Sequence, residues 1–340
     1  MTTHRLAVIP GDGIGREVVP AGLAVVRRAG EITGRSAFVV TDLDWSCERY
    51  LAAGTMMPAD GLRILEQHDA IFLGAVGFPG VPDHVSLWGL LLPIRQAFDL
   101  YVNLRPIRAL DGIPSPLRNG SPETIDMLFI RENTEGEYSG IGGRFHRGTP
   151  DEVAMQTSVY SRRGVERVAR YAFDRARERR RKVASVTKSN AIQHTAVLWD
   201  EVVREVAAEH PDVECASYLV DAMAARMVTH PASLDVCVAS NLYGDILTDL
   251  GGALQGSLGI AASANLDPTR RRPSLFEPVH GSAPDIAGKG VADPLATVWA
   301  GALMLEHLGD RDAAALVMRA LETVARSGPR TPDLGGRATT

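Results

Sequence analysis

Residues Arg5–Gly15 read RLAVIPGDGIG. The apolar run Arg5–Ile9 has the length and composition of a buried strand, and Pro10–Gly13 is a glycine-rich turn. Apolar residues recur at helical spacing from Ile14 onward, so a helix is expected directly after the turn. A strand that passes through a tight turn into a helix begins the strand–helix alternation of an α/β fold.

The alternation continues along the chain and predicts a mainly parallel sheet. Ala37–Val40 and Ala70–Gly74 are expected to be strands, and Leu62–Gln67 between them has helical spacing. Ile107–Pro122 is rich in proline and glycine and is expected to be a loop or a crossing between domains. Further expected elements are strands at Met127–Arg131, Val153–Ser161, Val183–Thr187 and Val236–Ser240, a helix at Val165–Ala176, and mostly helix and glycine-rich loop from Asp245 onward.

The composition excludes several classes of protein. The chain has 340 residues, 45% of them hydrophobic, which suits one large domain or two medium ones. Its formal net charge is −5, so no global basic field exists to hold nucleic acid. No apolar run approaches the roughly 18 residues needed to cross a bilayer, so a membrane is not an expected partner.

The cysteines and the N-terminus indicate a cytoplasmic protein. Cys47, Cys215 and Cys237 lie far apart and form neither a CxxC metal site nor a disulfide framework. Met1–Pro10 lacks the charged and apolar regions of a secretory signal. A reducing compartment is therefore expected.

One basic run could be a binding patch. Arg175–Lys182 holds six basic residues and one glutamate, which could form a phosphate or nucleic-acid site. The favoured alternative is the solvated end of an amphipathic helix, where cations complement the helix dipole.

The glycine-rich turn resembles a dinucleotide fingerprint only in part. Gly11, Gly13 and Gly15 follow a strand and open a helix, but the fingerprint requires a glycine where Arg16 stands. By itself the turn is weak evidence for a bound cofactor.

Three arginines indicate a dicarboxylic ligand. Arg95 and Arg105 lie ten residues apart, and Arg131 ends the predicted strand Met127–Arg131. Their planar guanidinium groups can grip carboxylates in bidentate fashion. Each arginine alone would more often form a surface ion pair.

An aspartate pair indicates a divalent cation. Asp245 and Asp249 stand four residues apart, which places both carboxylates on one face if the stretch is helical. Hard oxygen ligands of this kind suit Mg²⁺ or Mn²⁺, and Asp221 at the end of an apolar strand is a third candidate. Helix capping by Asp245 and simple exposure of Asp249 are the alternative.

Two further side chains are candidates for moving protons, and one loop for binding a ligand. Tyr138 lies in a glycine-rich loop, and Lys188 follows the strand Val183–Thr187; ordinary exposure is the alternative for both. Glu277–Gly290 carries few bulky side chains, so its backbone can approach a ligand closely. His280 alone would most often be a structural histidine.

Six motifs in order complete the sequence pattern. PGDGIG, NLRP, RENTEGEYSG, TKSN, SNLYGDILTDLGG and EPVHGSAPDIAGKG together resemble the decarboxylating β-hydroxyacid dehydrogenases, the family of isocitrate and isopropylmalate dehydrogenases. RENTEGEYS with PDHVSLWGLL resembles the tartrate and D-malate dehydrogenase branch. The resemblance implies the two-domain α/β fold of that family, which is not a Rossmann fold. It implies a larger domain of residues 1–98 plus 250–340 with the NAD-binding loop, and a smaller domain, 99–249, with the dimer interface and the metal and substrate residues.

The resemblance implies a role for each candidate. Arg95, Arg105 and Arg131 would bind the malate-like part of a hydroxy acid. Tyr138 would protonate the enolate, and Lys188 would help to take the hydroxyl proton.

The resemblance also implies a metal site and a shared active site. Asp221, Asp245 and Asp249 would bind Mn²⁺ or Mg²⁺, with K⁺ as an optional further cation, and Asp221 would also take part in catalysis. Lys188 and Asp221 would come from a second subunit, so the active unit would be a homodimer.

For the cofactor, the resemblance implies NAD. Asp285 would accept hydrogen bonds from the adenosine ribose and would repel the 2′-phosphate of NADP. Asp293 departs from the family, which usually has asparagine facing the adenine. The expected cofactor-binding residues are Glu277, His280, Gly281, Ser282, Ala283, Asp285 and Asp293.

The segment before Arg95 bears on substrate choice. Leu91 and Leu92 offer no polar partner for the third carboxylate of isocitrate, whereas Trp88 would fill space and favour a small substituent. D-malate or tartrate is therefore expected first, 3-isopropylmalate second and isocitrate third. Core packing is the alternative for Trp88. A non-catalytic regulatory subunit is a further alternative, but such chains lose the tyrosine, the lysine or an aspartate, and all are present here.

Overall fold

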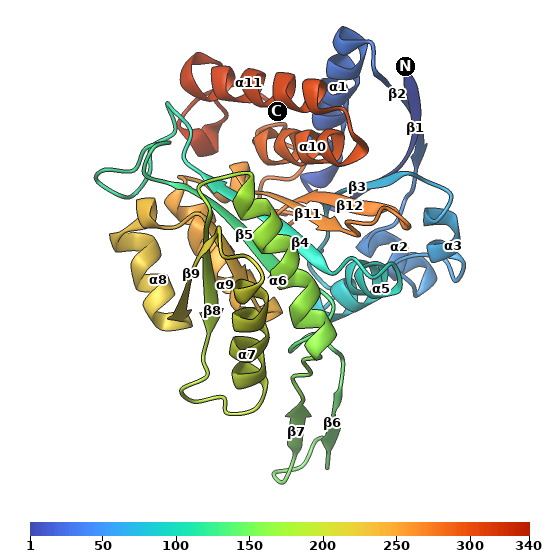
Figure 1. Ribbon diagram of the computed structural model, residues 1–340. Coiled ribbons are helices and arrows are strands. Elements are labelled where there is room, and N and C mark those ends of the chain that lie inside the picture. The colour runs from blue at the N-terminus through green and yellow to red at the C-terminus, as the bar shows by residue number, and fades with distance from the viewer. The chain divides into compact units, whose positions relative to one another are not determined.

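Strand β1 (Thr2–Gly11) runs into helix α1 (Gly15–Thr33) and the chain returns as strand β2 (Ser36–Asp42), as the sequence predicts. Strand β1 pairs in parallel with β2 on one side and with β3 (Ala70–Ala75) on the other. These elements are seen in a computed structural model that describes residues 1–340 (Figure 1). The predicted α/β class with a mainly parallel sheet is confirmed.

The chain forms two compact units. The first contains Met1–Leu100, Arg105–Ile125 and Gly252–Thr340, and the second contains Tyr101–Leu104 and Asp126–Gly251. The division differs from the predicted one chiefly in residues 105–125, which pack with the two ends of the chain, and also at residues 99–100 and 250–251. Hydrogen bonds explain this placement: Arg108 donates to Glu322 over 2.7 Å and Ser115 donates to the carbonyl of Leu254 over 2.6 Å.

In the first unit the strand order is β2-β1-β3-β12-β11. Strand β12 (Ser274–Pro278) is parallel to β3 and antiparallel to β11 (Ala262–Leu266). These two strands were not predicted, because the last third of the chain was expected to be helix and loop. All five residues of each are buried, and their polar members Ser263 and Asn265 conceal the apolar pattern that identifies a strand.

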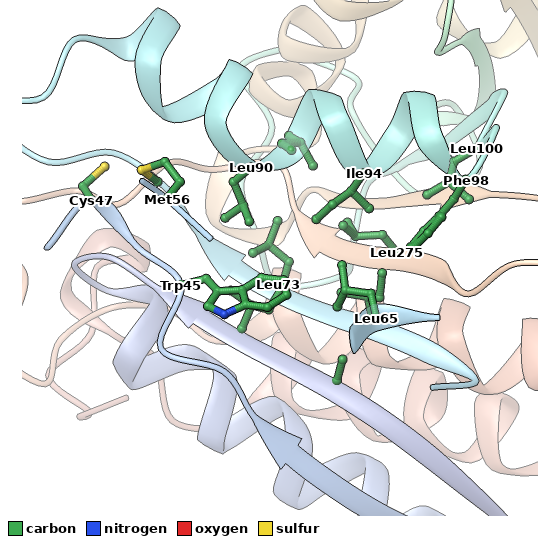
Figure 2. Packing of buried hydrophobic residues seen from close by; sticks show 14 of the residues in the cluster. Trp45, Cys47, Met56, Leu65, Leu73, Leu90, Ile94, Phe98, Leu100 and Leu275 are labelled. Atoms are coloured by element: carbon green, nitrogen blue, oxygen red, sulfur yellow. The ribbon is translucent and has the colours of Figure 1, made fainter. Parts of the chain in front are cut away.

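Helices cover both faces of this sheet (Figure 1). Helices α1, α10 (Leu295–Leu308) and α11 (Arg311–Ser327) pack together on one face. On the other face a buried apolar cluster joins the sheet to helix α5 (Leu92–Ala97); Figure 2 shows Leu73, Ile94 and Leu275 within it. Smaller elements on this side are α2 (Cys47–Ala53), α3 (Gly61–Leu65), α4 (Asp83–Ser86) and a π-helical turn at Leu87–Leu91.

In the second unit the parallel strands follow the order β5-β10-β8-β9. Helices α6 and α7 pack on this sheet, while a two-stranded antiparallel hairpin projects away from it (Figure 1). Strand β4 (Val102–Arg108) begins in this unit and ends in the first. The bounds are β5 Asp126–Glu132, β6 Gly142–Phe145, β7 Val153–Gln156, α6 Arg162–Arg177, β8 Lys182–Thr187, α7 Thr195–Ala208, β9 Glu214–Leu219, α8 Val220–Thr229, β10 Val236–Ala239 and α9 Asn241–Leu254.

The basic run at the end of α6 is tied into the second unit by ion pairs. Arg179 contacts the buried Asp235 over 2.7 Å, and the backbone N–H of Arg180 donates to the same carboxylate over 2.8 Å. Arg177 forms a bidentate pair with Asp212 on the surface. The run therefore serves as a paired helix end, which is the interpretation favoured from the sequence. No helix combines the length and apolar character that a membrane crossing requires.

We expect Asp235→Ala to destabilise the second unit by about 3 kcal/mol, because it leaves the Nε of Arg179 and the backbone N–H of Arg180 without their acceptor, while Asp126 still pairs with Nη2 of Arg179. Asp212→Ala removes an exposed partner of Arg177 and should shift the free energy of unfolding far less, because solvent screens this surface pair. Urea unfolding followed by circular dichroism measures both. Equal shifts in the unfolding midpoint would contradict the structural role of Asp235.

Candidate active site

Arg131 is the centre of a buried hydrogen-bond cluster in the second unit. It ends strand β5, and its Nε and Nη2 donate to Oδ1 of Asn241 over 3.0 and 2.7 Å. Its Nη1 forms an ion pair with Asp245, one turn further along helix α9. The helix approaches this closely because Gly244 has no side chain: a Cβ there would lie 2.6 Å from Cγ of Arg131. Asn241 was not among the predicted residues.

Tyr138 joins the same cluster. Its hydroxyl donates to Oδ2 of Asp245 over 3.1 Å, and the Arg131 guanidinium carbon lies 5.6 Å from the centre of its ring. A phenol, a guanidinium and a carboxylate therefore meet at one place. The cluster holds a proton donor beside a group that binds carboxylates.

Two glutamates shape the segment that carries Tyr138. The buried carboxylate of Glu132 accepts from the backbone N–H groups of Thr134 and Glu135, and burial raises its pKa above the usual range. Glu135 in turn accepts from the backbone and hydroxyl of Ser161, the residue that caps helix α6. These contacts fix both ends of the turn that leads to Tyr138.

Lys188 and Asp221 form a second pair in this unit. The Lys188 Nζ lies 2.5 Å from Oδ1 of Asp221, and this hydrogen bond lowers the pKa of the Asp221 carboxyl. Asp221 was expected at the end of a strand; it lies instead in the first turn of helix α8, directly after β9. Lys188 follows strand β8, the neighbour of β9, so the parallel strands bring the two residues together.

Asp245 and Asp249 lie one turn apart on helix α9, as the spacing predicts. Two hard carboxylate ligands on one helix face fit part of the shell of Mg²⁺ or Mn²⁺. Within the single chain no group of three acidic, histidine or cysteine side chains converges on a metal position. Asp221 therefore does not complete this pair within one chain.

In the first unit Arg95 is buried in helix α5 and pairs with Glu277 on strand β12. The Nη2–Oε1 distance is 3.0 Å, and the same oxygen accepts from Nδ2 of Asn265 over 2.8 Å. Glu277 was expected to bind the cofactor, and Asn265 was not predicted. Arg105, on strand β4, is also buried.

The two residues proposed to select the substrate have different surroundings. Leu91 packs into the apolar cluster of the first unit. Trp88 lies three residues earlier in the π-helical turn and has 42% of its surface exposed. Its side chain is not part of the core, so the core-packing alternative does not hold for Trp88 in this chain.

The loop Glu277–Gly290 rests on the beginning of helix α1. The N–H of Ile14 donates to the carbonyl of Ser282 over 2.9 Å, and Glu17 accepts from the N–H of Gly288 over 2.6 Å. Gly13 has φ +54° and lies so close that an added Cβ would be 2.1 Å from the Ser282 carbonyl oxygen. Gly13 thus lies against the loop, whereas Gly11 and Gly15 lie against the backbone of Ala75 and Pro10, so all three glycines are explained by contacts within the protein.

Several polar groups of the loop are available to a ligand. The Nδ1–H of His280 donates to the Gly281 carbonyl over 3.0 Å, while the buried Nε2 has no partner; burial lowers the pKa of His280. Asp285 is exposed, and Gly281 has open space around it. These features fit the adenosine end of a dinucleotide, which needs close backbone approach and a carboxylate for the ribose.

Asp293 lies two residues before helix α10 and is held by the first residue of that helix. Its Oδ1 accepts from the N–H of Leu295 over 2.9 Å, while Oδ2 is buried without a partner. Burial raises the pKa of Asp293 to about 7, with a further contribution from the charge of Asp333. The carboxyl is therefore held partly protonated near neutral pH.

Known proteins share both the sequence and the fold. The family model for isocitrate/isopropylmalate dehydrogenase matches residues 5–340. The chain belongs to this family. It is 55% identical over its full length to a probable tartrate dehydrogenase/decarboxylase of Agrobacterium vitis, covering 95% of that protein. It is 52% identical to a D-malate dehydrogenase (decarboxylating) of Escherichia coli strain K12, covering 100% of this chain and 96% of that protein.

A solved structure has the same fold. Isocitrate dehydrogenase from Methylococcus capsulatus superposes with a TM-score of 0.86 at 38% identity, covering 97% of this chain and 94% of that one. The predicted family and its fold are thereby confirmed.

We expect Asp293→Asn to stabilise the protein at pH 8 by about 3 kcal/mol, since it keeps the oxygen that accepts from the N–H of Leu295 and removes a buried charge. The folded-state pKa lies above the ordinary value of 3.8, so stability associated with protonated Asp293 is lost as pH rises from about 4 through about 7. The gain should therefore vanish below about pH 4. Thermal unfolding across this range measures it, with Asp44→Asn as control, because Asp44 is exposed in the same unit and does not contribute to the pKa of Asp293. A gain independent of pH would exclude the protonation argument.

Proposed function

We propose that this protein oxidises and decarboxylates a small 2-hydroxy dicarboxylic acid, D-malate or tartrate, using NAD and Mn²⁺ or Mg²⁺. The observation that carries this proposal is the cluster of Arg131, Tyr138 and Asp245. In this cluster a carboxylate-binding group, Arg131, and a proton donor, Tyr138, both contact a potential cation ligand, Asp245. The names of the A. vitis and E. coli relatives support the choice of substrate class.

Arginines would bind the two carboxylates of the substrate. Arg95, Arg105 and Arg131 are all buried, so their charges act in a medium that screens them weakly. The Nε of Arg95 is buried without a protein partner and remains available to an anion. A malate-like dianion satisfies such donors, whereas a neutral ligand leaves them unpaired.

Asp245 and Asp249, with Asp221 from a second subunit, would hold the divalent cation. Bound there, the cation supplies positive charge beside the substrate hydroxyl and the enolate that follows from it. The pair Asp245–Arg131 also fixes the carboxylate geometry, because one oxygen faces the guanidinium and the other the Tyr138 hydroxyl.

Two residues would move the protons of the reaction. With NAD bound as the hydride acceptor for C2 of the substrate, Lys188 in its neutral amine form, oriented by Asp221, would take the hydroxyl proton. The C–C bond to the β-carboxylate then breaks, CO₂ departs, and its electron pair forms the enolate. Tyr138 donates its hydroxyl proton to C3, and D-malate gives pyruvate. With tartrate, the extra hydroxyl at C3 offers a route that ends at oxidation.

The loop from His280 to Gly290 would hold the adenosine of NAD. The Asp285 carboxylate accepts hydrogen bonds from ribose hydroxyls and repels a 2′-phosphate, which favours NAD over NADP. Helix α1 supports this loop through Ile14 and Glu17, so the site is built on a regular element rather than on the loop alone.

A homodimer would complete the site. The hairpin β6–β7 exposes large apolar side chains that a monomer would leave in water, and Ile246 on helix α9 is 58% exposed directly beside Asp245. These surfaces fit a second copy of the chain that contributes Lys188 and Asp221. The apolar residues of the hairpin region are Ile141, Phe145, Val153 and Met155, with exposures of 49–54%.

We expect NADH formation from D-malate or a tartrate isomer to exceed that from 3-isopropylmalate and isocitrate at equal concentration, with Mn²⁺ and K⁺ present. The bulk of Trp88 favours a small C3 substituent. Absorbance at the NADH band measures the rates, and NADP in parallel tests the role of Asp285. Preference for 3-isopropylmalate would overturn the substrate assignment, and absence of turnover in a metal-loaded dimer would favour a regulatory subunit.

We expect two inactive variants, Tyr138→Phe and Lys188→Ala, to restore activity when co-expressed. If the site is shared, their heterodimer has one site with both native residues, which gives about a quarter of wild-type activity at random pairing. Co-expression of Tyr138→Phe with Asp245→Asn is the matched control, because these two residues contact each other within one chain. If neither co-expressed pair of variants recovered activity, the shared active site would be excluded.

A further inference from the structure

One oxygen of Glu277 holds two buried side chains together. Oε1 accepts from Nη2 of Arg95 over 3.0 Å and from Nδ2 of Asn265 over 2.8 Å. All three residues are buried in the first unit. The glutamate thus faces helix α5, which carries Arg95, and contacts a residue proposed to bind substrate.

The register of two strands creates this arrangement. Strands β11 and β12 are antiparallel, with Ser263 opposite Glu277 and Asn265 opposite Leu275. Asn265 and Glu277 are therefore diagonal neighbours, two positions apart, and their side chains emerge on the same face of the sheet. Asn265 is fully buried and also lies 3.4 Å from the carbonyl of Leu275, so its amide has little freedom.

Arg95 keeps donors for a further acceptor. Glu277 engages Nη2, while Nε is buried and has no partner in the protein. An unsatisfied buried donor of a charged group is costly, and a carboxylate placed beside it would remove that cost. The contact with Glu277 balances the charge of Arg95 and holds its guanidinium plane before such an anion arrives.

We propose that Glu277, fixed by Asn265, is a positioning residue that orients Arg95 toward a carboxylate of the hydroxy acid. This role rests on the proposed function and replaces the expected role of Glu277 in binding the cofactor. Removing one member of a buried ion pair leaves the other charge uncompensated, so without Glu277 the Arg95 guanidinium loses the contact that orients it. Loss of Glu277 is therefore felt at the substrate and not at the dinucleotide.

The test compares Glu277→Ala, Glu277→Gln and Asn265→Ala with the wild-type enzyme. Glu277→Ala removes the acceptor and should raise KM for D-malate or tartrate at least about tenfold, with a smaller change in kcat. Glu277→Gln keeps an oxygen at the Oε1 position and should recover most of that loss, and Asn265→Ala should fall between them. The dissociation constant of NAD, from isothermal titration calorimetry, should change by less than about twofold in all three.

Glu322→Ala is the matched control, because Glu322 pairs with Arg108 over 2.7 Å in the same unit and lies half-exposed. It should leave KM and NAD binding unchanged. Weakened NAD binding with an unchanged KM in Glu277→Ala would assign Glu277 to the cofactor and overturn the positioning role. A rise in KM together with a fall in kcat and weaker NAD binding, none of them recovered in Glu277→Gln, would show that Glu277 has only a structural role. That result would also overturn the positioning role. Absence of wild-type turnover with every hydroxy acid would overturn the proposed function itself.

Discussion

A guanidinium group can be buried only where acceptors meet it, and this constraint organises both units of the protein. Arg131 is enclosed by Asn241 and Asp245 from one helix, and Arg95 is held by Glu277 from a central strand. In each case the partner arises more than a hundred residues away in sequence. The arginines therefore tie separate segments together while they keep a positive charge below the protein surface.

The same constraint explains why the candidate site is rich in contacts among its own residues. Asp245 is proposed to bind a cation, and it also accepts from Arg131 and Tyr138. Lys188 is likewise paired with Asp221. Groups that are oriented by neighbours before a ligand arrives lose little freedom on binding, which is the physical basis of preorganisation.

A second constraint is close approach of backbone to backbone at the start of helix α1. Gly13 adopts a left-handed conformation and lies against the Ser282 carbonyl, where no side chain fits. A motif that looks like an incomplete dinucleotide fingerprint is thus a support for a different loop. Gly13 allows the same close approach as the glycines of a Rossmann fingerprint, but the group next to it is the Ser282 carbonyl instead of a pyrophosphate.

The sequence by itself determined the α/β class, the strand–helix order of the first half, the family and the candidate residues, because these depend on local periodicity and on motifs of contiguous residues. Tertiary structure alone decided the partners of Arg131 and Arg95, which are Asn241 in the first case and Glu277, held by Asn265, in the second. It also decided the burial of Asp293. It also revealed strands β11 and β12, whose buried polar residues break the apolar pattern. The physical reason is that such contacts produce no pattern of apolar and polar residues along the chain. A hydrogen bond between residues over a hundred positions apart forms only when strands and helices pack, and a pKa that burial shifts depends on the same packing.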